Sequence, residues 1–167
     1  FELVYQKRVV DDRLYVDFLR KERGKAALRG FFEALLKLDP GRAILWHCKD
    51  GKDRTGLASA MLLTALGADR ESVLTDYMLT NAFHKDLVSK ARQTADQLHF
   101  PPDKAQLFLF MSGGVLRGLM ETALDDLDTA YGSAVCYLEK EIGINEEKRN
   151  RLRLKFLVSQ EIPTDFP

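Results

Sequence analysis

The stretch from Trp46 to Gly56, WHCKDGKDRTG, brings one cysteine, one arginine and two glycines close together in the sequence. It follows an apolar run and precedes a second apolar segment with helical spacing, so we expect a loop that leads into a helix. Backbone N–H groups in such a loop, together with the positive end of the helix, can surround a phosphate group. Gly51 and Gly56 permit a tight turn and a close approach of the backbone, and the Arg54 guanidinium can bind two phosphate oxygens. The stretch therefore predicts an anion-binding loop.

Cys48 lies at the base of this expected loop. The field that attracts phosphate also favours a thiolate over a thiol, and a thiolate can attack phosphorus to form a phosphocysteine. The leaving oxygen needs a proton, for which Asp53 and Asp50 are the local candidates. The Thr55 hydroxyl can donate to the sulfur and help it leave in the hydrolytic step. Because amides and Arg54 can neutralise the developing charge, we expect no metal and no other cofactor.

Residues 47–56 resemble the phosphate-binding loop of the Cys-x5-Arg protein tyrosine phosphatase superfamily. The fuller pattern HCxxGKDRTG is similar to the bacterial tyrosine-phosphatase branch of that superfamily, which also acts on other phosphoesters. Residues 76–81, DYMLTN, resemble the DYxxSN segment of the branch, and residues 131–138, YGSAVCYL, resemble its YGSxxxYL signature. The resemblance extends over roughly residues 31–158.

The resemblance implies both a fold and a set of catalytic roles. The implied fold class is α/β, a central and mostly parallel sheet flanked by helices, of which this chain is mainly the helical part, with N-terminal strands missing. Cys48 is implied as the nucleophile, Arg54 as the phosphate clamp and Asp53 as the general acid. Lys52 is implied as a further cation that either binds substrate or stabilises the loop.

The remaining polar residues of the loop and its surroundings have supporting roles in this interpretation. His47, which precedes the nucleophile on an expected buried strand, is predicted to orient the loop by hydrogen bonding rather than to act as a base. Asp76 is expected to support the pocket. Besides Arg54, the residues expected to bind substrate are Lys49, Asp50, Gly51, Lys52, Thr55 and Gly56.

Two lysines in the loop bear on the choice of substrate. Lys49 and Lys52 resemble the pair in HCKAGKGRTG, a phosphoinositide phosphatase loop, where they favour a multiply charged headgroup. We expect hydrolysis of phosphomonoesters with release of inorganic phosphate. The substrate is a phosphotyrosine protein first, and a phosphoinositide or a broader set as the alternative. A pseudophosphatase that binds phosphate without turnover is a third possibility, against which the joint presence of Cys48, Arg54 and Thr55 argues.

Most of the chain has the apolar spacing of helices. Helices are predicted over residues 12–38 with a break at Gly24, and over 57–66, 71–81, 85–98, 115–130, 134–141 and 146–158, the last with Asn145 as its N-cap. Residues 106–111 fit a strand or a helix. Residues 43–46, AILW, predict a buried parallel strand, and residues 3–6 a second strand. Such strands need partners, so we expect a missing N-terminal segment to supply them.

Composition sets the outer limits of the interpretation. The 167 residues suit one domain, expected over 1–159 with a tail over 160–167. Lys and Arg (25) balance Asp and Glu (25), so no overall positive charge attracts nucleic acid. The longest run without charge, residues 55–68, is too short to cross a bilayer, and the two cysteines fit neither a disulfide framework nor a zinc site. The chain begins with Phe and has no visible signal peptide, so we expect a truncated or processed chain and leave its compartment open.

Overall fold

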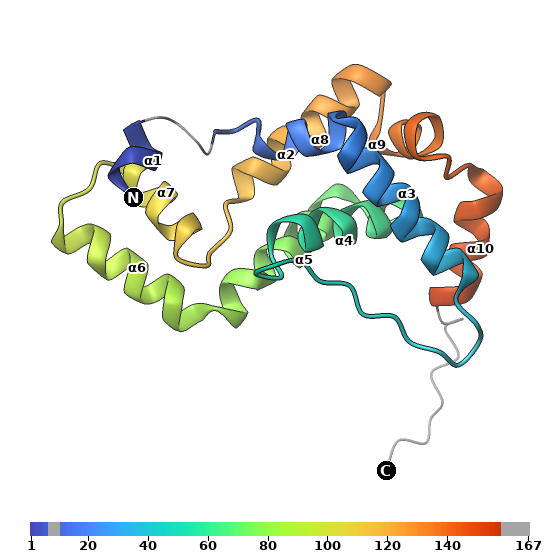
Figure 1. The fold of residues 1–167 in the computed structure, drawn as a ribbon, viewed down its shortest axis with the longest axis horizontal. Coiled ribbons are helices and arrows are strands. Elements are labelled where there is room, and N and C mark those ends of the chain that lie inside the picture. Colours follow the sequence, from blue (N-terminus) through green and yellow to red (C-terminus); the bar gives the residue numbers. More distant parts are fainter. Residues whose placement is uncertain (7–10, 158–167) are drawn as a thin grey trace, which may run out of the picture.

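The computed structural model describes residues 1–6 and 11–157, and within these ranges the fold is built from helices alone. The helices follow one another with short connections, except for the long extended segment between α3 and α4 (Figure 1). In chain order they are α1 (Glu2–Gln6), α2 (Leu14–Arg20), α3 (Glu22–Lys37), α4 (Asp53–Leu66), α5 (Arg70–Phe83), α6 (Lys85–Gln97), α7 (Pro102–Met111), α8 (Arg117–Tyr131), α9 (Ala134–Tyr137), the π-helical turn η1 (Leu138–Ile142) and α10 (Glu146–Phe156).

Helix α4 lies within the main hydrophobic core, between α3, α5 and α10. Its side chains at Leu57, Met61 and Ala65 are buried, as expected from a segment that is apolar nearly all round. The helix begins at Asp53, immediately after the predicted loop, and ends at Gly67, whose φ of 101° lies in the left-handed region. The core therefore holds the helix whose N-terminus faces the predicted anion-binding loop.

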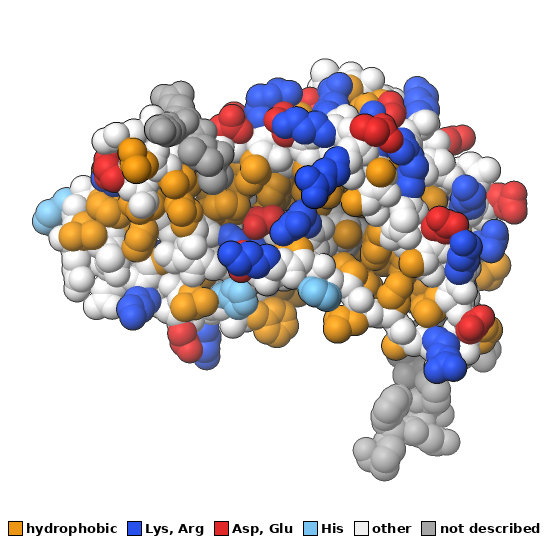
Figure 2. Space-filling model, viewed as in Figure 1, with side chains coloured by type: hydrophobic (Ala, Val, Ile, Leu, Met, Phe, Trp, Pro, Cys, Tyr) orange, Lys and Arg blue, Asp and Glu red, His pale blue; other side chains and the backbone are white. Residues whose placement is uncertain are grey.

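Helices α1, α6 and α7 form a lobe at one side of the molecule (Figure 1). The ring of Phe1 lies 5.7 Å from that of Phe100 and 5.2 Å from that of Phe108, and the ammonium of Lys104 lies 2.7 Å from Glu2. Figure 2 shows many apolar side chains on this side of the molecule, whereas charges of both signs are spread over the rest of the visible face. No helix in the described ranges is long and apolar enough to cross a membrane.

The strand predicted over residues 43–46 is not formed within the described residues. The segment runs through the structure without strand pairing, and exposure alternates along it: Ile44 and Trp46 are partly buried, whereas Leu45 is 87% exposed. The indole N–H of Trp46 donates to Ser59 Oγ over 3.2 Å, which attaches this segment to α4. One face of the segment is thus packed against helices, and the other face, which a sheet would cover, is open.

Three other sequence predictions need correction or completion. Residues 3–6 belong to helix α1 and not to a strand, and residues 106–111 are helical within α7, which begins at Pro102. The break within residues 12–38 falls at Lys21 rather than at Gly24. Gly24 is instead a helical position where a Cβ would lie 1.8 Å from the carbonyl oxygen of Phe18, so glycine allows α3 to pass close to the end of α2.

The remaining helix predictions agree with the structure to within a few residues at each end. Asn145 caps α10, because its side-chain oxygen accepts a hydrogen bond from the N–H of Lys148 over 3.0 Å. The predicted helix over 134–141 is split between α9 and the π-helical turn η1. The tail expected over 160–167 and the last residue of the predicted helix 146–158 lie outside the described residues.

The YGSxxxYL signature at residues 131–138 shapes the connection between α8 and α9. Gly132 ends α8 with a φ of 88°, and Ser133 caps α9 by accepting a hydrogen bond from the N–H of Cys136 over 3.0 Å. The hydroxyl of Tyr137, which is fully buried, donates to the carbonyl oxygen of Leu19 over 2.8 Å. The signature therefore fixes α9 against α2 and has a structural role.

Candidate active site

The predicted loop turns sharply and runs directly into α4. Gly51 adopts a φ of 68°, and a Cβ there would meet no atom within 4 Å, so it is the left-handed backbone and not the lack of space that favours glycine. The N–H of Gly56 donates to the carbonyl oxygen of Lys52 over 2.8 Å, and the N–H groups before it have no acceptor within the helix. Backbone N–H groups of Asp50, Gly51 and Thr55 surround the sulfur of Cys48 and give the loop its positive potential.

Cys48 has the electrostatic surroundings of a reactive thiol. Burial raises the pKa of its thiol, but hydrogen bonds from the side chain and backbone of Thr55 and from the N–H groups of Asp50 and Gly51 outweigh that effect and lower the pKa to about 6. The start of α4 adds the positive end of a helix of 14 residues. At neutral pH the sulfur is therefore mainly a thiolate, which is the nucleophilic form.

The hydroxyl of Thr55 serves this sulfur. Among the described residues, Thr55 Oγ1 is the one buried side-chain polar atom without a hydrogen-bond partner. The Thr55 side chain lowers the pKa of Cys48, so its hydroxyl is the side-chain donor available to the thiolate. A donor of this kind stabilises the sulfur both before attack and when it leaves.

Three charged side chains of the loop are exposed: Lys49, Asp50 and Arg54. None of these three side chains forms a hydrogen bond or an ion pair with another described residue. A guanidinium beside a helix N-terminus without a carboxylate partner is unfavourable alone, and it gains from an anion bound there. Arg54 and Lys49 are thus the cations that remain available to a phosphate ester.

Lys52 is buried, whereas its predicted substrate-binding role requires an ammonium that reaches the open side of the loop. Its side chain is buried, and its ammonium donates to the carbonyl oxygens of Phe110 over 2.5 Å and of Gly114 over 3.0 Å. It also lies 3.7 Å from the centre of the Phe110 ring. Burial lowers the pKa of Lys52, against the attraction of nearby Asp53 and Asp50. This arrangement favours the loop-stabilising alternative, because the ammonium is bound by two backbone carbonyl oxygens inside the protein.

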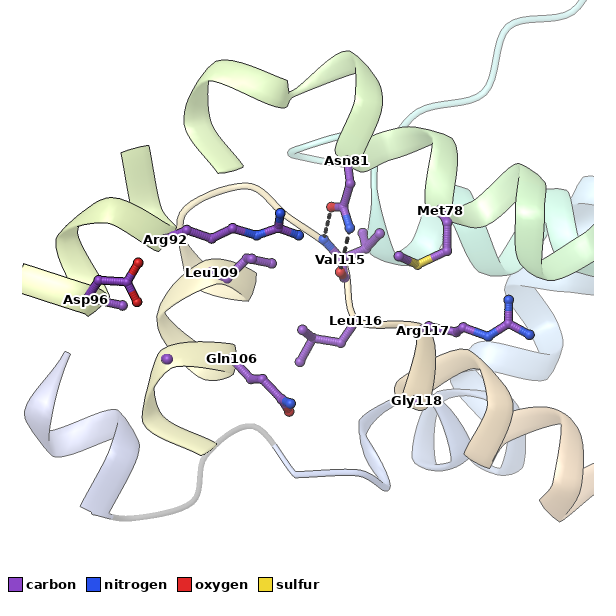
Figure 3. Close-up of a pocket in the computed structure, with 12 residues that line it drawn as sticks. Met78, Asn81, Arg92, Asp96, Gln106, Leu109, Val115, Leu116, Arg117 and Gly118 are labelled. Carbon is purple, nitrogen blue, oxygen red and sulfur yellow. Dashed lines mark hydrogen bonds between the residues drawn. The ribbon is translucent and has the colours of Figure 1, made fainter. Parts of the chain in front are cut away.

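The connection that receives Lys52 is itself held by Asn81 of the DYMLTN motif. Asn81 donates to the carbonyl oxygen of Val115 over 3.0 Å and accepts from its N–H over 2.8 Å (Figure 3). The same connection borders a cavity of about 580 Å³, into which the side chains of Arg92 and Gln106 extend. Sequence reasoning named Asn81 only as a motif residue. Its two hydrogen bonds give it a concrete structural role.

Asp53 is hydrogen-bonded to the buried Tyr15, which in turn is hydrogen-bonded to the buried Tyr77. The hydroxyl of Tyr15 donates to Asp53 Oδ1 over 2.6 Å and lies 2.8 Å from the hydroxyl of Tyr77. Burial is the main cause that raises the pKa of both tyrosines, so both stay protonated. The second carboxylate oxygen, Oδ2, lies 4.0 Å from the Lys52 ammonium. Tyr15 lies among apolar residues in the sequence. The one signal of its role was its hydroxyl, because a buried tyrosine hydroxyl usually has a hydrogen-bond partner.

The two supporting residues differ in how the structure places them. His47 is exposed rather than buried on a strand, and its Nδ1 lies 3.0 Å from the carbonyl oxygen of Cys48, so it contacts the loop backbone. Asp76 is exposed, and no described residue gives it a hydrogen bond or an ion pair. Its neighbour Tyr77 approaches the loop helix instead, because a Cβ on Gly56 would lie only 3.0 Å from the Tyr77 ring.

The comparisons with known proteins identify the family of this chain. The sequence pattern of the tyrosine phosphatase family matches residues 6–158. The chain belongs to the tyrosine phosphatase family. The triple specificity protein phosphatase PtpB of Mycobacterium tuberculosis is 32% identical over 134 residues, which cover 76% of this chain and 48% of PtpB. A tyrosine-protein phosphatase of Nostoc commune is 32% identical over 120 residues, 68% of this chain and 38% of that protein. The chain thus matches less than half the length of these relatives.

Membership of the tyrosine phosphatase family confirms the resemblance drawn from the loop and its two accompanying motifs. An α/β fold fits this family, but the described residues contain no strand, so only the helical part of the predicted fold class is present in them. Within the described residues, no cluster of three or more His, Cys, Asp or Glu side chains could hold a metal ion.

Proposed function

We propose that this member of the tyrosine phosphatase family hydrolyses phosphomonoesters through a phosphocysteine intermediate, and that phosphotyrosine proteins are its first substrates. The observation that carries the proposal is the lowered pKa of Cys48, about 6, in a loop of N–H donors at the start of α4. A residue that only bound phosphate would not need a thiolate at this position. The names of the two relatives support the same reaction.

The proposed reaction has two steps. In the first, the Cys48 thiolate attacks phosphorus and the bond to the ester oxygen breaks, while the loop N–H groups and Arg54 stabilise the charge on the phosphoryl oxygens. Asp53 gives its proton to the leaving oxygen. In the second step, water attacks the phosphocysteine, Asp53 takes a proton from that water, and the sulfur–phosphorus bond breaks. Inorganic phosphate leaves, and the Thr55 hydroxyl stabilises the restored thiolate.

A broader substrate range is the second candidate. The exposed cations of Lys49 and Arg54 support it, because neither has a carboxylate partner among the described residues. The description of PtpB as a triple specificity phosphatase also favours a range beyond phosphotyrosine. The two substrate ranges can be distinguished by measuring turnover on phosphotyrosine peptides, on phosphoserine peptides and on a panel of phosphoinositides. Activity on phosphotyrosine peptides alone would leave phosphotyrosine as the substrate class, turnover of phosphoserine peptides would add phosphoserine, and turnover of lipid headgroups would add phosphoinositides.

The reaction itself is tested with a simple aryl phosphate. The wild-type chain should hydrolyse it, and Cys48→Ser should lose activity while still binding inorganic phosphate, which the loop N–H groups and Arg54 hold without a bond to sulfur. A Cys48→Ser variant as active as the wild type would contradict the proposal. Vanadate binding by the wild type without hydrolysis of any substrate would favour the pseudophosphatase.

We also propose that residues 43–46 form a strand of a mostly parallel sheet, whose partner strands lie outside residues 11–157. The alternation of exposure around Leu45 supports this, as does the greater length of the relatives. Hydrogen exchange at Leu45 in the protein expressed from its natural gene tests it. Slow exchange of that amide is expected, and exchange at the rate of an open chain would contradict the pairing.

A further inference from the structure

Tyr77, Tyr15 and Asp53 form a row of hydrogen bonds that leads from the core to the loop. Their oxygen atoms are separated by 2.8 Å and 2.6 Å in turn. An ionised carboxylate can only accept hydrogen bonds, so Tyr15 uses its single proton to donate to Asp53. The hydroxyl of Tyr77 must then donate to Tyr15. Every proton in the row points toward Asp53.

The row is rigid because the core holds both rings. Tyr15 is 1% exposed and Tyr77 3% exposed, and their rings meet edge to face with centres 6.0 Å apart. Gly56 allows the Tyr77 ring to lie against α4, where any Cβ would touch it at 3.0 Å. Tyr15 comes from α2 and Tyr77 from α5, so two different helices fix one oxygen of the carboxyl group.

We propose that Tyr15 is a positioning residue for the general acid, which holds Asp53 Oδ1 as an acceptor and leaves Oδ2 as the oxygen that carries the transferable proton. This inference rests on the proposed function, in which Asp53 is the acid. Because Oδ1 accepts from Tyr15 whether Asp53 is charged or neutral, the carboxyl group keeps one orientation in both steps. The same oxygen, Oδ2, gives its proton to the leaving group and later takes one from water. An acid held in one orientation avoids the loss of rate that a freely rotating side chain causes.

The experiment compares two substrates that differ only in how much their leaving group needs a proton. Tyr15→Phe keeps the buried ring and removes the hydroxyl. We expect it to lower kcat about tenfold on phenyl phosphate, a fraction of the hundredfold or more that a general acid contributes. On p-nitrophenyl phosphate, whose leaving group is activated, we expect less than a twofold change. In the Asp53→Asn background, Tyr15→Phe should have no further effect on phenyl phosphate.

Tyr137→Phe is the matched control. Tyr137 is equally buried, and its hydroxyl also bonds to α2, through the carbonyl oxygen of Leu19 at 2.8 Å, but it does not contact Asp53. It should lower thermal stability without a difference between the substrates. An equal loss on both substrates in Tyr15→Phe, matching Tyr137→Phe, would overturn the inference, because it would show a packing effect alone.

The failure of this inference can be separated from the failure of the proposed function. If Asp53→Asn lowers kcat equally on both substrates, Asp53 is not the acid, and this inference falls while hydrolysis through Cys48 stands. If Asp53→Asn affects phenyl phosphate selectively and Tyr15→Phe does not, only the role of Tyr15 is wrong. Should Tyr15→Phe fail to fold, Tyr77→Phe gives the answer, because it leaves the bond between Tyr15 and Asp53 but removes the donor to Tyr15. A selective loss of about threefold on phenyl phosphate supports the inference, and no selectivity overturns it.

Discussion

The ammonium of Lys52 lies 3.0 Å from the carbonyl oxygen of Gly114. This hydrogen bond joins the phosphate-binding loop to the connection between α7 and α8. Asn81 holds the same connection from its other side through both backbone groups of Val115. The loop is thus supported by a chain of contacts that ends on α5. Its shape depends on residues more than 25 positions away in the sequence as well as on its own glycines.

Lys52→Met should weaken the fold as well as the reaction. The substitution leaves the carbonyl oxygens of Phe110 and Gly114 without their donor, which we expect to cost about 2–3 kcal/mol in the free energy of unfolding. Thermal denaturation and kcat on an aryl phosphate measure the two effects. A raised KM with unchanged thermal stability would contradict this account and would return Lys52 to a substrate-binding role.

Lys49→Met is the control for this prediction. Lys49 is exposed, and no described residue gives it an ion pair. Its replacement should leave the melting temperature unchanged and raise KM for multiply charged substrates more than for a single aryl phosphate. The two lysines of the loop should therefore separate into one structural and one substrate-facing residue.

Asn81→Ala should destabilise the connection on which Lys52 rests. Both backbone groups of Val115, a residue that is 1% exposed, lose their partner, at an expected cost of about 2 kcal/mol in the free energy of unfolding. Urea denaturation checks the value. Gln106→Ala is the control. Gln106 borders the same cavity, its side chain forms no hydrogen bond with another described residue, and its replacement should change the free energy of unfolding by less than about 0.5 kcal/mol. Equal effects of the two substitutions would refute the role of Asn81.

Gly56→Ala should show that a close helix contact, and not only the loop turn, requires glycine. A Cβ at Gly56 would lie 3.0 Å and 3.3 Å from two atoms of the Tyr77 ring, so we expect a net loss of about 1–2 kcal/mol from overpacking. Gly30→Ala, in α3, meets no atom within 4 Å and should gain about 0.5–1 kcal/mol. If both variants gain stability in thermal denaturation, the contact with Tyr77 is not tight.

Thr55→Val should raise the pKa of Cys48 above its value of about 6, because the hydroxyl that lowers it is lost. The thiolate fraction at pH 6–7 then falls, and so does the rate of alkylation by iodoacetamide at that pH. Thr55→Ser keeps a hydroxyl and should retain most of the reactivity. The same pH dependence in Thr55→Val and the wild type would show that the backbone N–H groups alone set the pKa.

The sequence identified the chemistry of the loop because spacing within eleven neighbouring residues is enough to define a phosphate cradle. It also predicted most helices, since their apolar faces repeat with the helical period. It could not predict that Lys52 is buried against Gly114, or that Tyr15 reaches Asp53, because both contacts join distant segments. The sequence could not show whether residues 43–46 form a strand, because an apolar run shows a preference for an extended chain, whereas pairing depends on a partner strand that the described residues do not contain.

The most direct test of the account is the pH dependence of Cys48 alkylation, measured in a Cys136→Ser chain so that only one thiol reacts. The account predicts a rate that rises with a midpoint near pH 6 and falls when inorganic phosphate or vanadate occupies the loop. A midpoint near pH 8.5, the value of an ordinary thiol, with no protection by either oxyanion, would contradict the central claim that the loop stabilises a thiolate and binds phosphate.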